Sequence, residues 1–67
     1  MNDADVIDPD VIDLVVQLCT RIGMIMEDAT PVALDASREG LDERIAALAL
    51  ATRTMATIAA AAEGLLQ

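Results

Sequence analysis

The sequence predicts an all-α protein, an antiparallel helical hairpin with main helices over residues 9–29 and 36–64 that pairs with a second copy into a four-helix bundle. Apolar residues recur at helical spacing in these two segments, and Thr30-Pro31 separates them. The 67 residues, read as a single domain, are too few to build a large core. A homodimer is therefore the expected means of support.

The first helix is predicted to follow a short acidic lead, residues 1–7, and to begin at Asp8-Pro9-Asp10. An aspartate caps a helix N-terminus well, proline suits the first helical position, and carboxylates favour the positive end of the helix dipole. One apolar row then recurs at alternating spacings of four and three: Val11, Val15, Leu18, Ile22, Ile25 and Ala29. A second row widens this apolar side: Ile12, Val16, Cys19, Gly23 and Met26.

The first helix is expected to end at Thr30-Pro31, because proline has no amide hydrogen and disfavours a helical residue before it. Asp35 and Ser37 are the candidate N-caps of the second helix, whose first turns Gly40 should weaken. Its predicted packing row is Leu41, Ile45, Leu48, Thr52, Met55, Ala59, Ala62 and Leu66, and Gly64 is the expected C-terminal signal.

The second helix is apolar on nearly all sides beyond Ile45, which indicates burial on several sides. We therefore expect it to lie at the centre of the subunit interface. The predicted oligomer-interface residues are Val15, Leu18, Ile22, Ile25, Leu41, Ile45, Leu48, Met55, Ala59 and Ala62. This architecture is similar to small dimeric hairpin bundles of the Rop kind, a similarity in length and helix number that implies no function.

The arginines should set the register of the hairpin. If the turn centres near residue 33, Arg53 lies level with Asp13, and Arg38 lies level with Glu27 or Asp28. Such exposed ion pairs would contribute only about 0–1 kcal/mol each.

The charge of the chain excludes several classes of partner. A net charge of -8 opposes binding to nucleic acid and to anionic membranes. Residues 45–62 are apolar enough to suggest a membrane span, but Arg53 near their middle costs about 2.5–3.5 kcal/mol on insertion. We expect neither nucleic acid nor a membrane as partner.

The residue types for common catalysis are missing. The chain has no His, no aromatic residue and one cysteine, Cys19, which is expected to fill the core. One cysteine forms neither an intrachain disulfide nor a common zinc site, and no histidine is present to activate it as a nucleophile. We expect no enzyme activity, no catalytic or metal-binding residue and no cofactor. The predicted function is a non-enzymatic oligomerisation or protein-interaction module.

The alternative is a small acidic regulator, antitoxin-like or anti-sigma-like, that binds a basic partner protein. The candidate partner surface is Met24, Leu50, Asp3, Asp5, Asp10 and Asp13. Met1–Asp5 is acidic where a secretory signal would be basic, and a lone thiol suits a reducing compartment, so a cytoplasmic location is expected. Abundant alanine and the use of Arg without Lys suggest a bacterial source.

Overall fold

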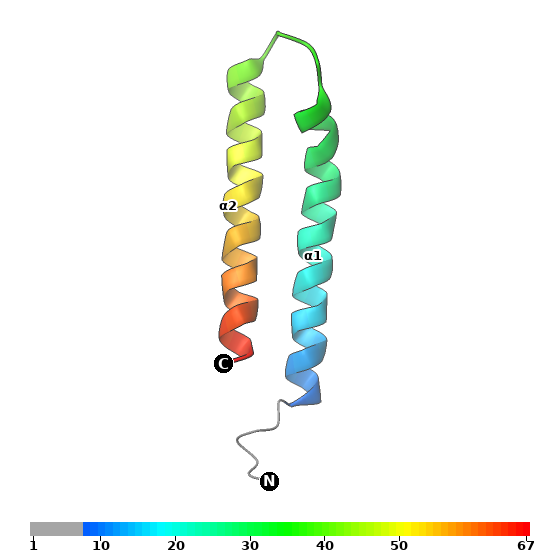
Figure 1. The fold of residues 1–67 in the computed structure, drawn as a ribbon, viewed down its shortest axis with the longest axis vertical. Coiled ribbons are helices and arrows are strands. Elements are labelled where there is room, and N and C mark those ends of the chain that lie inside the picture. Colours follow the sequence, from blue (N-terminus) through cyan, green and yellow to red (C-terminus); the bar gives the residue numbers. More distant parts are fainter. Residues whose placement is uncertain (1–7) are drawn as a thin grey trace.

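The computed structural model describes residues 8–67, which form two antiparallel helices packed side by side (Figure 1). Helix α1 spans Pro9–Leu34 and helix α2 spans Leu41–Leu65. A short connection joins them at one end, and the start of α1 and the end of α2 lie together at the other (Figure 1). This confirms the all-helical hairpin. The acidic lead, residues 1–7, lies outside the described residues.

The start of α1 follows the sequence prediction. Asp8 is the N-cap, and its Oδ1 accepts a hydrogen bond from the backbone N–H of Asp10 at 2.8 Å. Its backbone carbonyl accepts from Val11 at 2.9 Å and from Ile12 at 3.1 Å. Pro9 occupies the first turn, where its missing N–H costs no helical bond.

The predicted end of the first helix at residue 29 is wrong, because α1 continues through Pro31 to Leu34. Pro31 lies in the last turn, so its missing N–H removes only the helical bond that the Glu27 carbonyl would accept. The Thr30 hydroxyl donates to the Met26 carbonyl at 2.7 Å and adds a bond in the same turn. The continuation also brings Val32 against α2, where it is half-buried.

The predicted start of the second helix at residue 36 is also wrong. Asp35 is the C-cap of α1, and its Oδ1 accepts from the N–H of Ser37 at 2.8 Å. The Ser37 hydroxyl accepts from the N–H of Glu39 at 3.1 Å. These local bonds compete with helix formation, and they hold residues 35–39 in a connection instead. Gly40, in the left-handed conformation with φ +66°, is the N-cap from which α2 begins.

Arg44 ties this connection to the first turn of α2. Its guanidinium donates to the carbonyl of Asp35 at 2.6 Å, to that of Ser37, and to that of Glu39 at 3.3 Å. Its Nε lies 3.9 Å from Oδ2 of Asp35, and the side chain is only 16% exposed. One cation therefore satisfies three carbonyls that lie outside both helices.

The packing row of α1 agrees with the sequence prediction. The half-buried positions on α1 are Val11, Val15, Leu18, Ile22, Ile25, Ala29 and Val32. Since α2 is the only other element described, these positions mark the line along which the two helices touch.

The packing row of α2 is only partly as predicted. Leu48 and Met55 are half-buried and Ala62 is buried, whereas the remaining predicted positions are exposed: Leu41, Ile45, Thr52, Ala59 and Leu66. The other half-buried positions are Arg44, Ala49, Ala51 and Ile58. Because α2 has no polar stripe to define its outer side, the spacing did not determine which apolar row faces α1.

The predicted register is wrong as well. The connection centres near residues 37–38 rather than 33, so Arg53 lies level with Ile22 and Gly23 instead of Asp13. Arg38 lies within the connection itself. Within residues 8–67, the ion pair that forms is the one between Arg44 and Asp35.

The left-handed conformation of Gly40 makes its replacement costly. Gly40→Ala is expected to lower the free energy of unfolding by about 1 kcal/mol, because a Cβ disfavours positive φ. Gly64→Ala is the matched control, since Gly64 is helical with open space around it. That variant should leave stability unchanged or raise it by up to about 1 kcal/mol. Urea unfolding followed by circular dichroism measures the free energy of unfolding of both variants. Equal changes in the two variants would contradict a left-handed conformation that glycine is needed for at residue 40.

The contacts of Arg44 predict a second stability difference. Arg44→Met should lower the free energy of unfolding by about 2 kcal/mol, because it leaves the carbonyls of the connection without their charged donor. Arg53→Met is the control on the exposed side of α2, and its effect should stay within about 0.5 kcal/mol. The same unfolding measurement applies, and an Arg44 variant as stable as the control would refute this role.

Candidate interaction surface

The hairpin leaves most of its apolar side chains in contact with water. Within residues 8–67 only Ala62 is buried, at 8% exposure. The large apolar residues that are exposed by a third or more are Ile12, Leu14, Val16, Met24, Met26, Leu34, Leu41, Ile45, Leu50, Leu65 and Leu66. The outside of the hairpin is therefore the candidate interaction surface, and these side chains are distributed unevenly over it.

The residues that directly follow the packing positions form one face of the hairpin, named here the apolar face. On α1 they are Ile12, Val16, Cys19, Gly23, Met26, Thr30 and Ala33. On α2 the packing positions at helical spacing are Arg44, Leu48, Ala51, Met55, Ile58 and Ala62, and the residues that follow them are Ile45, the half-buried Ala49, Thr52, Ala56, Ala59 and Glu63. An antiparallel helix pair is related by a two-fold axis normal to its plane, so both rows point to the same side. Leu41, one turn before Ile45, extends the row on α2.

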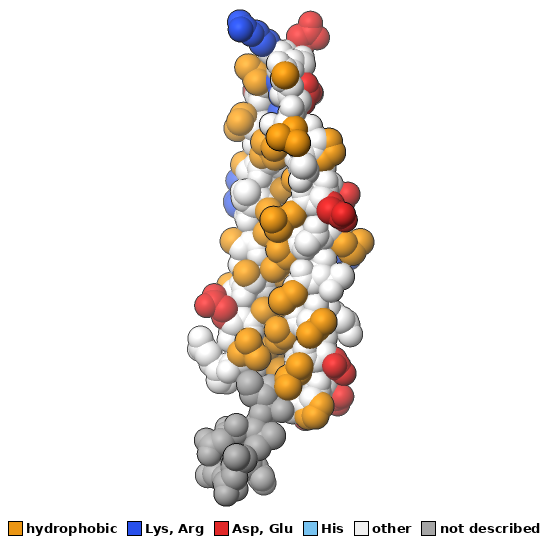
Figure 2. Space-filling model, turned by 45° about the vertical axis from the view of Figure 1, so that its right-hand side comes forward, with side chains coloured by type: hydrophobic (Ala, Val, Ile, Leu, Met, Phe, Trp, Pro, Cys, Tyr) orange, Lys and Arg blue, Asp and Glu red, His pale blue; other side chains and the backbone are white. Residues whose placement is uncertain are grey.

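The residues that directly precede the packing positions form the opposite face, named here the charged face. They are Asp10, Leu14, Gln17, Arg21, Met24, Asp28 and Pro31 on α1, and Glu43, Ala47, Leu50, Thr54, Thr57 and Ala61 on α2. This face carries four charged residues, whereas Glu63 is the one charged residue of the apolar face. Figure 2 shows a lengthwise band of hydrophobic side chains over the helices, with acidic side chains at its margins.

The threonines of α2 make the helix more apolar than its composition indicates. The hydroxyls of Thr52, Thr54 and Thr57 donate back to backbone carbonyls of their own helix at 2.9, 2.9 and 3.0 Å. Between Ile45 and Ala62, Arg53 is therefore the only polar side chain without such an internal bond. By length and composition α2 is also apolar enough to cross a membrane, with a mean hydropathy of 1.6 over its most apolar window.

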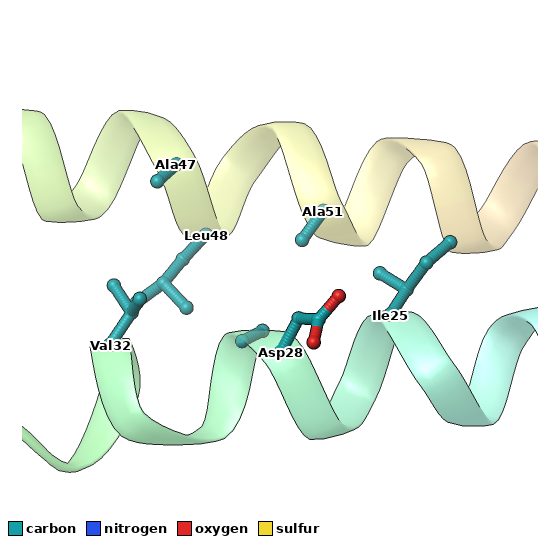
Figure 3. A pocket seen from close by; sticks show the side chains of 7 residues that line it. Ile25, Asp28, Val32, Ala47, Leu48 and Ala51 are labelled. Atoms are coloured by element: carbon teal, nitrogen blue, oxygen red, sulfur yellow. The ribbon is translucent and has the colours of Figure 1, made fainter.

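A shallow groove of about 220 Å³ lies between the helices near the connection. It is lined by Ile25, Asp28, Ala29, Val32, Ala47, Leu48 and Ala51 (Figure 3). Asp28 is the only titratable residue in the lining, so the groove holds no acid–base pair and no nucleophile.

The structure divides the predicted interface residues into two groups. Val15, Leu18, Ile22, Ile25, Leu48, Met55 and Ala62 pack between α1 and α2 within one hairpin, whereas Leu41, Ile45 and Ala59 lie exposed on the apolar face. Cys19, expected in the core, is exposed on that face, because the two-helix contact is too narrow to reach it.

The predicted partner surface is only partly described. Met24 is 54% exposed and Leu50 is 59% exposed, and both lie on the charged face. Asp10 and Asp13 are exposed near the start of α1, whereas Asp3 and Asp5 lie outside the described residues. Within residues 8–67 no group of three or more Cys, Asp or Glu side chains could hold a metal ion.

The apolar face was only half visible in the sequence. Its α1 row appears there as a second apolar row, but joining it to Ile45 and Ala59 requires the rotation of α2 that the structure provides. Comparisons with protein-family models, with curated proteins and with solved structures gave no match to this chain.

Proposed function

We propose that this chain is a non-enzymatic oligomerisation module, in which two hairpins associate into a four-helix-bundle homodimer. The observation that carries the proposal is the near absence of a core, since Ala62 is the only buried residue among residues 8–67. Two helices bury one stripe of each other, whereas four helices enclose a continuous core. A second hairpin would cover the apolar side chains that the first leaves exposed.

The polar side chains also favour an interaction role over catalysis. The hydroxyls of all five threonines donate to backbone carbonyls of their own helices. The groove beside Asp28 offers a single carboxylate. The lone thiol suits a reducing compartment, and we propose the bacterial cytoplasm as the location.

The mass in solution tests the proposal. Light scattering on a sizing column, across a hundredfold dilution, should give twice the chain mass of 7.0 kDa at the higher concentrations. Leu48→Asp should abolish the folded dimer, because Leu48 packs between the helices, and Leu50→Asp should retain helical structure, because Leu50 is 59% exposed. A folded monomer at all concentrations, or a normal helical spectrum for Leu48→Asp, would contradict the proposal.

A basic partner protein is the second candidate. Asp10 and Asp13 are exposed, and neither forms an ion pair within residues 8–67. If the acidic end of α1 binds a basic protein, Asp10→Asn with Asp13→Asn should weaken a complex isolated by pull-down, and added salt should weaken it further. Asp42→Asn, at the other end of the hairpin, is the control. A complex that neither the Asp10→Asn, Asp13→Asn double variant nor added salt weakens would exclude the electrostatic mechanism.

A further inference from the structure

We propose that the second copy covers the apolar face, so that the two hairpins dock through this face and leave both charged faces in water. This inference rests on the proposed self-association and assigns its surface. It follows from three properties of the described residues: the distribution of charge over the two faces, the size of the apolar face and the position of its side chains.

The distribution of charge distinguishes the two faces. Each copy carries a net charge of -8, so two copies repel unless their contact excludes the carboxylates. Docking through the charged face would desolvate Asp10, Asp28 and Glu43 of both copies. Docking through the apolar face buries no charged residue along its length, because its single carboxylate, Glu63, lies at the open end of the hairpin.

The dimensions of the apolar face match those of a stable dimer. A helix of 26 residues is about 39 Å long, and two helices about 9 Å apart span about 19 Å across. The outline of the hairpin seen from this side therefore covers roughly 750 Å², which leaves room for an interface of standard size, in which each partner buries about 800 Å² of accessible surface. A symmetric dimer uses the same patch on both copies, and this face permits it with little repulsion because its one carboxylate, Glu63, lies at the open end.

The large side chains of this face gather near the start of each helix, at Ile12 and Val16 on α1 and at Leu41 and Ile45 on α2, with Met26 further along α1. Val16 is 57% exposed, Met26 is 55% exposed and Ile45 is 62% exposed. Between them lie small residues, among them Gly23, where an added Cβ would meet nothing within 4 Å. Large side chains of one copy can therefore pack over small residues of the other, as knobs-into-holes packing between helices requires.

The interior of a lipid bilayer is the competing environment for the apolar face, because α2 is apolar enough to cross a membrane. A hairpin that entered a bilayer would take the charged residues of α1 with it, among them Arg21, Glu27 and Asp28. Arg53, at the middle of α2, would enter as well. Each of these charges opposes insertion, whereas none of the four belongs to the apolar face, so the second copy is the favoured occupant.

Two matched pairs of variants test the assignment. Met26 and Met24 are 55% and 54% exposed on opposite faces of α1, and Ile45 and Leu50 are 62% and 59% exposed on opposite faces of α2. Met26→Lys and Ile45→Lys should each raise the dimer dissociation constant at least about a hundredfold, because each substitution occurs once in each copy and so places two lysines in the symmetric interface. Met24→Lys and Leu50→Lys should change it by less than about threefold. Sedimentation equilibrium of the full chain measures all four.

Cys19 provides a test without substitution, because the single thiol lies on the apolar face. Its alkylation by N-ethylmaleimide should slow at least tenfold as the concentration rises through the monomer–dimer transition. If the apolar-face lysine variants fail to fold while their equally exposed controls fold, a need for the second copy at this face is still supported. The alkylation rate of the unsubstituted chain then tests the face independently.

The outcomes separate this inference from the proposed function. A wild-type dimer that the charged-face variants weaken as much as the apolar-face variants would overturn the assignment and leave self-association standing. A constant alkylation rate across the transition would do the same. A wild-type chain that stays monomeric would overturn both the proposed homodimer and the assignment of its surface. A chain that becomes helical only with phosphatidylcholine vesicles would overturn both as well, and it would identify lipid as the occupant of the apolar face.

Discussion

The contact between two helical cylinders is a narrow line, and this constraint governs the structure. The row from Val11 to Val32 on α1 meets the row from Arg44 to Ala62 on α2, and among residues 8–67 a single alanine, Ala62, becomes buried, at 8% exposure. The free energy gained from so little burial is small beside the entropy lost in ordering two long helices. Burial of the apolar side chains beside this line would therefore add to the stability of the hairpin.

The connection is held by polar interactions rather than by apolar packing. Asp35 and Ser37 turn the chain through side-chain bonds to the backbone, and Gly40 supplies the conformation that other residues disfavour. Arg44 then bonds three carbonyls of this segment. Together these contacts fix where α2 begins, and hence which residues of the two helices lie level with each other.

The accuracy of the sequence predictions followed the clarity of the local signals. Asp8-Pro9 defines the start of α1 by its own chemistry, and the apolar row from Val11 to Ala29 contrasts with a polar side, so both were predictable. The row on α2 was predictable only in part, at Leu48, Met55 and Ala62, because alanine on nearly every side leaves the rotation of the helix to tertiary contacts. Pro31 failed as a stop signal, since α1 continues for one turn beyond the helical bond that this proline removes. The role of Arg44 depends on a connection that spacing alone does not reveal. The apolar face needed the rotation of α2, so only its α1 half was predictable.

The short connection also determines the order in which the hairpin can assemble. Val32 and Leu48 are near neighbours along the chain, whereas Val11 and Ala62 lie far apart in sequence. Contacts next to the connection close a small loop and so form at the lowest entropic cost, and each later pair extends a zipper toward the termini. The hairpin should thus form on the microsecond-to-millisecond timescale of small helical proteins. The proposed pairing with a second chain would be slower and would depend on concentration. The rate-limiting event would then be an encounter between molecules rather than a rearrangement within one.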